Sequence, residues 1–121
     1  GGCHCGAVRF VVRVREHAAL DCNCSICKKK AFLHLNVPQV DFVVESGSEA
    51  LASYEFNTGI AKHRFCRICG VHPFYTPRSH PSDVDVNVRC LDGDVLGRFS
   101  LRPFDGARWE QSVAEIPPGG R

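Results

Sequence analysis

Three short cysteine clusters constrain this chain more than any other feature of its sequence. Seven of its eight cysteines lie in Cys3-His4-Cys5-Gly6, Cys22-Asn23-Cys24-Ser25-Ile26-Cys27 and Cys66-Arg67-Ile68-Cys69-Gly70. Cysteines one or two residues apart on a tight turn are poor partners for disulfides that staple distant segments, but they are natural chelates for a metal ion. The pattern predicts a domain organised around metal sites in a reducing compartment.

Counting ligands divides the seven cysteines into two sites. A structural zinc takes four ligands in a tetrahedron. Two clusters end in Cys-Gly, where a glycine tolerates positive φ and lets backbone N–H groups turn toward the sulfurs. Together these two clusters predict one closed site, formed by Cys3, Cys5, Cys66 and Cys69. The middle cluster supplies three ligands and leaves a position open, which is the arrangement of a catalytic zinc. Its cysteines are Cys22, Cys24 and Cys27.

Several alternatives remain open at this stage. A fourth protein ligand could close the second site, with Cys90, His34 or His72 as candidates, although Cys90 is better explained as a small buried apolar residue. An iron–sulfur cluster usually needs four thiolates, and scattered reduced thiols would need no metal at all. His4 and His63 also lie near clusters, but a histidine in such a position is most often a supporting or surface residue.

Charge and composition exclude some classes of protein. Fifteen basic and thirteen acidic residues give a formal charge of +2, which seven thiolates around two zinc ions would change to −1. Neither value indicates nucleic-acid binding through bulk charge. The one basic run, Lys28-Lys29-Lys30, is most simply a solvated face. No apolar run reaches membrane-spanning length. The reducing compartment that the short cysteine spacings favour makes a cytoplasmic location the expectation.

The apolar pattern predicts a mostly β fold. We expect strands over residues 7–14, 32–37, 40–45, 51–56, 62–66 and 84–88. The strands over 40–45 and 51–56 are expected to pair across the Ser46-Gly47-Ser48 turn. In the strand over 84–88, the valines are expected to point inward, and Asp83, Asp85 and Asn87 outward.

One helix is predicted near the end of the chain. Asp105 is a suitable N-cap, Trp109 with Val113 and Ile116 repeats at helical spacing, and Pro117 ends the pattern. Trp109 is expected to anchor this helix in the core. We therefore expect one zinc-binding domain over residues 1–116 and a tail over 117–121.

The clusters and their surroundings resemble the glutathione-dependent formaldehyde-activating family, which includes the relatives of centromere protein V. The matching segments are 2–8 with Phe10, then 22–28, then 65–70. Residues 21–30, 54–58 and 74–79 look especially like the centromere protein V branch. The resemblance extends from residue 2 to about residue 110.

The resemblance implies an all-β, tent-like fold of stacked antiparallel sheets with zinc knuckles. It implies two zinc ions per chain: a structural ion on Cys3, Cys5, Cys66 and Cys69, and an active-site ion on Cys22, Cys24 and Cys27. The named activity of the family is the condensation of formaldehyde with glutathione, a carbon–sulfur lyase reaction. Lys28, Lys29 and Lys30 could then meet the carboxylates of glutathione.

The expected partners are therefore a small thiol, such as glutathione, and a small aldehyde. Binding to a membrane or to nucleic acid is not expected. A homodimer is possible. The alternative function is a zinc-stabilised binding module of the centromere protein V type without catalysis. A third is an enzyme of the same fold that acts on another small electrophile or thiol.

Overall fold

Nine short strands and two one-turn α-helices make up the part of the chain that the computed structural model describes, residues 1–115. The strands are β1 (Arg9–Val12), β2 (Ala18–Cys22), β3 (Leu33–Pro38), β4 (Phe42–Ser46), β5 (Leu51–Tyr54), β6 (His63–Cys66), β7 (Phe74–Tyr75), β8 (Asp83–Asn87) and β9 (Ser100–Phe104). The helices are α1 (Cys27–Lys30) and α2 (Trp109–Ser112). Short 3-10 turns cover Gln39–Asp41, Ser48–Ala50, Val88–Cys90, Leu96–Arg98, Gly106–Arg108 and Val113–Glu115. Nothing helical in residues 1–115 has the length and apolarity to cross a bilayer.

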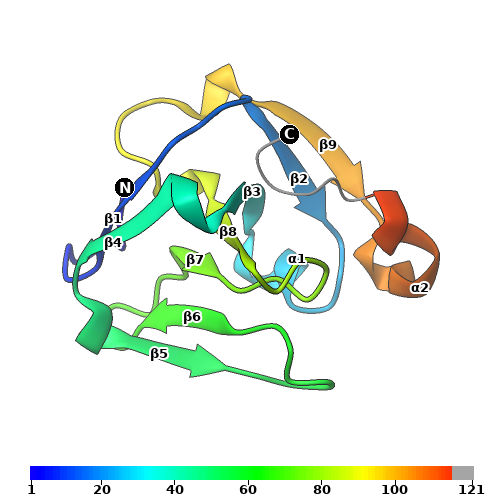
Figure 1. Cartoon of the computed structure of the whole chain (residues 1–121), viewed down its shortest axis with the longest axis horizontal. Coiled ribbons are helices and arrows are strands. Elements are labelled where there is room, and N and C mark those ends of the chain that lie inside the picture. Colours follow the sequence, from blue (N-terminus) through cyan, green and yellow to red (C-terminus); the bar gives the residue numbers. More distant parts are fainter. Residues whose placement is uncertain (116–121) are drawn as a thin grey trace.

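The strands form one larger sheet and two ribbons, which confirms the prediction of a mostly β fold with several small sheets. The larger sheet has five strands in the order β7-β8-β3-β2-β9, and the ribbons are β1-β4 and β5-β6 (Figure 1). Neighbouring strands are antiparallel except β2 and β9, which run in parallel. Figure 1 shows these two strands leading side by side toward α2, while β5 and β6 form a separate ribbon below β7.

Alternating apolar residues in β1 and on either side of it anchor the core, as the sequence predicts. Val8 and Phe10 are fully buried, and Val12 and Val14 pack against the same core at partial burial. The Phe10 ring stacks on Phe42 of β4 at a centroid distance of 5.5 Å and meets the edge of Phe74 at 6.0 Å. This aromatic cluster joins the β1-β4 ribbon to the larger sheet.

The predicted pairing of residues 40–45 with 51–56 is wrong, although both segments contain strands. β4 pairs with β1, and β5 pairs with β6. The Ser48–Ala50 turn separates the two strands and sends β5 into a different sheet. The short connection between β4 and β5 therefore leads from one sheet to another and does not form a hairpin.

The predicted outward direction of Asp85 and Asn87 is also wrong, because both side chains are buried. β8 lies inside the sheet between β7 and β3, and the structure provides polar partners on the face that we expected to be solvated. Asp85 Oδ2 lies 2.8 Å from His34 Nδ1. The Asn87 side chain accepts from the backbone of Arg89 and donates to the carbonyl of His72.

The short C-terminal helix that the sequence predicts is present, but its expected cap is wrong. α2 covers one turn, flanked by 3-10 turns on both sides. The Asp105 carboxylate accepts from the side chain of Asn23 at 3.0 Å instead of capping a helix. Trp109 is half-buried with its ring edge against Phe104, so it does not belong to the central core. The predicted roles of Ile116 and Pro117 and the predicted tail over 117–121 lie outside the described residues.

The sequence patterns missed β2, β7, β9 and α1. β9 contains a proline and is exposed over most of its length, so its residues carry little alternation. α1 begins at Cys27 and contains the whole basic triplet. The triplet therefore occupies one helical turn directly after the second cysteine cluster.

We predict that Phe10→Ala lowers the free energy of unfolding by about 3–5 kcal/mol, because it removes the ring that joins two sheets and leaves a cavity. Denaturant unfolding of the unmodified chain and the variant under the same conditions measures this change. The matched control is Val43→Ala on the same ribbon, where the side chain is 56% exposed and the expected change is within about 0.5 kcal/mol. Equal losses for the two variants would contradict the assignment of Phe10 to the core.

Candidate functional site

The first metal centre joins the start of the chain to the turn after β6. The sulfurs of Cys3, Cys5, Cys66 and Cys69 all lie within 4.8 Å of one another. Cys5 Sγ is 3.7 Å from the sulfurs of both Cys3 and Cys66. The two Cys-Gly endings adopt the predicted positive φ, +82° at Gly6 and +79° at Gly70. Four sulfurs at this spacing can hold one metal ion, in the grouping predicted from the sequence.

Backbone N–H groups support negative charge on these sulfurs. The N–H of Val8 donates to Cys3 Sγ at 3.3 Å. A backbone hydrogen bond from Cys5, joined by another from Val71, lowers the pKa of the Cys69 thiol to about 6. Such hydrogen bonds stabilise thiolates, which are the form that binds metal. The donor set of the first centre therefore fits a cation.

The second metal centre is built from the end of β2, the loop that follows and the first residue of α1. The sulfurs of Cys22 and Cys27 and one ring nitrogen of His34 lie within 4.8 Å of one another. Hydrogen bonds link Cys24 to both of these thiols, and the N–H of Cys27 donates to Cys24 Sγ at 3.4 Å. Three cysteines and a histidine thus form a second group that can hold a metal ion.

The three thiols of this group oppose one another's ionisation. The pKa of Cys24 is lowered because its sulfur accepts from the thiols of Cys22 and Cys27. The pKa of Cys22 rises to about 11, chiefly through Cys24, and that of Cys27 rises through both neighbours and burial. Three thiolates at this spacing need a cation between them. This electrostatic requirement shows that the residues fit a metal.

His34 is the one of the three alternative ligands that the structure brings to this cluster. It extends from β3, and its side chain is buried beside Asp85 and the Tyr75 hydroxyl, at 2.8 Å and 3.3 Å from Nδ1. Cys90 instead packs against the apolar core, as predicted, with its Sγ 3.7 Å from the carbonyl of His72. Among the described residues, neither Cys90 nor His72 belongs to a group that could bind metal.

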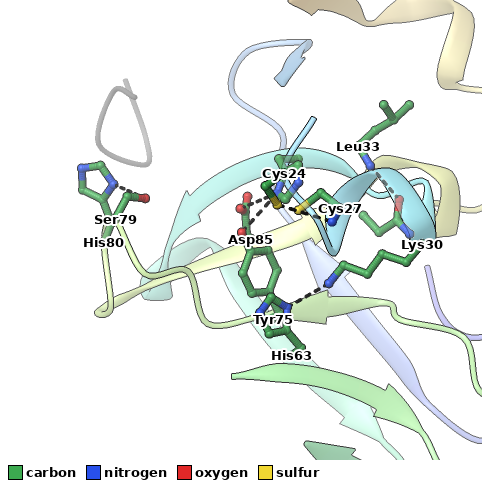
Figure 2. A network of polar contacts seen from close by, with 11 residues as sticks. Cys24, Cys27, Lys30, Leu33, His63, Tyr75, Ser79, His80 and Asp85 are labelled. Carbon is green, nitrogen blue, oxygen red and sulfur yellow. Dashed lines mark hydrogen bonds and ion pairs between the residues drawn. The ribbon is translucent and has the colours of Figure 1, made fainter. Parts of the chain in front are cut away.

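A half-buried lysine, Lys30, and a buried histidine, His63, lie next to the second centre (Figure 2). Lys30 Nζ reaches from α1 to 3.0 Å from His63 Nδ1, and it lies over the rings of Phe32 and Tyr75 at 4.7 and 4.8 Å. Burial, followed by the charge of Lys30, lowers the pKa of His63 to about 4. His63 is therefore neutral near pH 7, and its Nδ1 accepts from the Lys30 ammonium, so the ring proton is on Nε2.

The aromatic rings hold His63 in place. Its ring stacks on Tyr75 at 5.0 Å with 9° between the planes, and on Phe56 from the other side at 5.6 Å. From the sequence, His63 is expected to be a supporting or surface residue near a cysteine cluster, and no function is expected for Tyr75 or Asp85. These residues come from β6, β7 and β8, which are far from the second cluster along the chain, so spacing gave no signal for them.

A cavity of about 690 Å³ opens beside the second centre. Its wall includes Cys22, Cys24, Cys27, His34, His63, Tyr75, Asp85 and Trp109. It includes the basic residues Arg13, Arg15, Lys28, Arg78 and Arg102 and the acidic residues Glu16 and Asp41. Within the described chain, Lys29, Lys30 and the cysteines of the first centre are not part of this wall. The volume is typical of small-molecule sites.

The basic residues of the cavity wall differ in their interaction partners and in their exposure to solvent. Arg15 makes a two-pronged pair with Asp41, at 2.6 and 2.9 Å, which lowers the pKa of that carboxyl. Arg78 lies over the Trp109 ring at 4.7 Å and 3.6 Å from the carboxylate of Glu110. Lys28 is exposed at the start of α1. The wall of the cavity therefore contains several basic side chains, and some of them are already paired with a carboxylate.

Comparison with known proteins places the chain in a family. The profile of the family described as "Glutathione-dependent formaldehyde-activating enzyme" matches residues 1–106. A Halomonas elongata protein named "Putative glutathione-dependent formaldehyde-activating enzyme" is 33% identical over 104 residues, which cover 78% of this chain and 66% of that protein. The crystal structure of a Rhodobacter sphaeroides protein matches with a TM-score of 0.75 at 36% identity, covering 84% of this chain and 98% of the other.

We predict that Gly106→Ala weakens metal binding at the second centre alone. A Cβ at this position would lie 2.3 Å from Cys22 Sγ and 3.1 Å from Cys24 Cβ, so the thiols must move. We expect a loss of affinity of about tenfold or more at one of the two sites. A competition titration with a chromogenic chelator measures the affinities of both.

The matched control is Gly97→Ala, also in a 3-10 turn, where an added Cβ has no atom within 4 Å. This variant should bind metal like the unmodified chain. If Gly106→Ala also binds metal with unchanged affinity, the prediction that an added Cβ displaces a metal-binding sulfur of Cys22 is wrong.

Proposed function

This chain belongs to the glutathione-dependent formaldehyde-activating family, and we propose that it is a zinc-dependent carbon–sulfur lyase. The reaction would join formaldehyde, or a related small aldehyde, to glutathione and give S-(hydroxymethyl)glutathione. The observation that carries this proposal is the placement of the second cysteine cluster in the wall of the 690 Å³ cavity. A metal centre facing a cavity of ligand size supports a reactive function more than a purely structural one.

We propose zinc for both centres, because thiolate-rich four-ligand groups with this spacing are typical of zinc. The first centre, with four sulfurs outside the cavity wall, would serve stability. At the second centre, Cys22, Cys24 and Cys27 would hold the ion. A bound zinc would lower the pKa of an incoming thiol and favour its thiolate form. We further propose a cytoplasmic location, because short-spaced free cysteines persist in a reducing compartment.

The reaction forms a bond between the glutathione sulfur and the carbonyl carbon, and one proton moves from sulfur to oxygen. His63 is suited to assist the carbonyl oxygen, because Lys30 fixes its proton on Nε2 and the stacked rings hold its plane. Its lowered pKa makes it a hydrogen-bond donor that stays neutral throughout. This hydrogen bond would be strengthened where a bound substrate displaces water from the cavity.

The carboxylates of glutathione need positive charge near the mouth of the cavity. Lys28 is the member of the predicted basic triplet that contributes to the wall, and Arg13 lies there as well. We propose that these two bind the carboxylates. Lys30 would act on the aldehyde through His63, and Lys29 would remain on the exposed face of α1.

The first prediction of this function concerns rate. Formaldehyde and thiols also combine without help, so the test is acceleration: exchange NMR should show faster interconversion of glutathione and its hydroxymethyl adduct with the zinc-loaded chain than with buffer. Cys24→Ser should abolish the acceleration while the first centre keeps its zinc. Cys90→Ser is the matched control and should retain it. A fully loaded chain that gives only the uncatalysed rate would falsify the lyase proposal and favour a binding module.

The second prediction concerns recognition of the thiol. Lys28→Ala should raise the KM for glutathione about fivefold, which corresponds to about 1 kcal/mol for an exposed ion pair, and the increase should shrink at high salt. Lys29→Ala, one residue along the same helix, should leave KM unchanged. If neither variant or both variants change KM, Lys28 does not have the proposed role.

A further inference from the structure

His34 has a buried ring nitrogen without any partner in the protein. Its side chain is 6% exposed, Nδ1 is 2.8 Å from Asp85 Oδ2, and Nε2 is buried without a hydrogen bond. A buried polar atom without a partner costs about 1–3 kcal/mol, so such atoms are rare unless a ligand occupies them. The ring lies against the sulfurs of Cys22 and Cys27, within 4.8 Å.

We propose that Nε2 of His34 is the fourth protein ligand of the second centre, which is then a three-cysteine, one-histidine site in the resting protein. This inference deepens the proposed function and rests on its assignment of a metal to this centre, but it does not depend on lyase activity. In this site, His34 fills the coordination position that the sequence analysis left open. A substrate thiol would bind the metal either by displacing His34 or as a fifth ligand.

The hydrogen bond to Asp85 supports this assignment. A histidine that binds metal through one nitrogen usually donates from the other to a carboxylate, which fixes the tautomer and the direction of the ring. With the Nδ1 proton directed to Asp85 Oδ2, the lone pair of Nε2 is free to bind a cation. Asp85 is therefore a positioning residue: it would orient His34 and would not contact the metal.

The position of these residues in the sheet also favours this assignment. His34 pairs with Asn87 in the register of β3 and β8, so Asp85 lies two residues along on the neighbouring strand. Residues at this offset share a face of the sheet, which places both side chains toward the cysteine loop. His72 also has an unpartnered buried Nδ1, but it lies outside the group formed by Cys22, Cys27 and His34.

A direct test uses the chain loaded with cadmium-113 and labelled with nitrogen-15 at histidine. Among the described histidines, we expect one ring nitrogen to show scalar coupling to the metal, and the signal should vanish in His34→Ala but persist in His72→Ala. Absence of coupling in the unmodified, fully loaded chain overturns the proposal. This readout requires no substitution, so it holds even if His34→Ala fails to fold.

Zinc affinity tests the supporting role of Asp85. Asp85→Ala should weaken the second centre by about 10–100-fold while the first centre keeps its affinity. Asp85→Asn should recover most of that loss, because an amide oxygen still accepts the Nδ1 proton. Equal losses in both variants, or none, would overturn the positioning role.

These outcomes separate the inference from the proposed function. Metal–nitrogen coupling in a chain without lyase activity leaves the three-cysteine, one-histidine site intact and rejects the reaction. Lyase activity in a chain without coupling supports the reaction and rejects the ligand.

Discussion

The mutual repulsion of closely spaced thiolates is the constraint on which this structure depends. Seven sulfurs lie in two groups, and the thiols of the second group oppose one another's ionisation unless a cation lies between them. A cation that satisfies them also fixes the segments that carry them. Cys22 ends β2, Cys27 begins α1 and Cys66 ends β6, so each metal centre ties together elements that short strands alone would hold weakly.

The two centres have different surroundings. Backbone N–H groups from Val8 and Val71 support the first, which lies away from the cavity. The second faces the cavity and is surrounded by side chains, above all His34, Asp85 and Tyr75, which belong to three strands of the larger sheet. Backbone N–H groups also donate at the second centre, for example from Cys27 to Cys24 Sγ, so the cavity and the side chains around it are what distinguish this centre. This difference in position is the reason for proposing a structural role for the first centre and a reactive role for the second.

Sequence reasoning predicted the parts of the molecule that depend on local spacing. The division of the cysteines, the positive φ at Gly6 and Gly70, and the inward face of β1 all follow from residues that are close in the chain. It failed where the decisive contact is between distant strands. The alternation of Asp85 with two valines predicts a solvent-facing side chain. Asp85 is buried instead because β8 lies between β7 and β3, and its carboxylate meets the His34 ring diagonally across the register. The pairing of β4 with β1 likewise depends on tertiary packing and not on the connecting turn.

The three lysines of the basic triplet have three different environments, although they are adjacent in the sequence. Successive residues of an α-helix point about 100° apart, so three adjacent lysines on α1 cannot share one face. Lys28 lines the cavity, Lys29 is exposed, and Lys30 is turned back to the histidine between the aromatic rings. Burial lowers the pKa of Lys30, which a solvated lysine would not experience. The helix therefore divides this run of charge: Lys28 lies in the cavity wall, Lys29 lies in solvent, and Lys30 lies behind His63, the proposed hydrogen-bond donor.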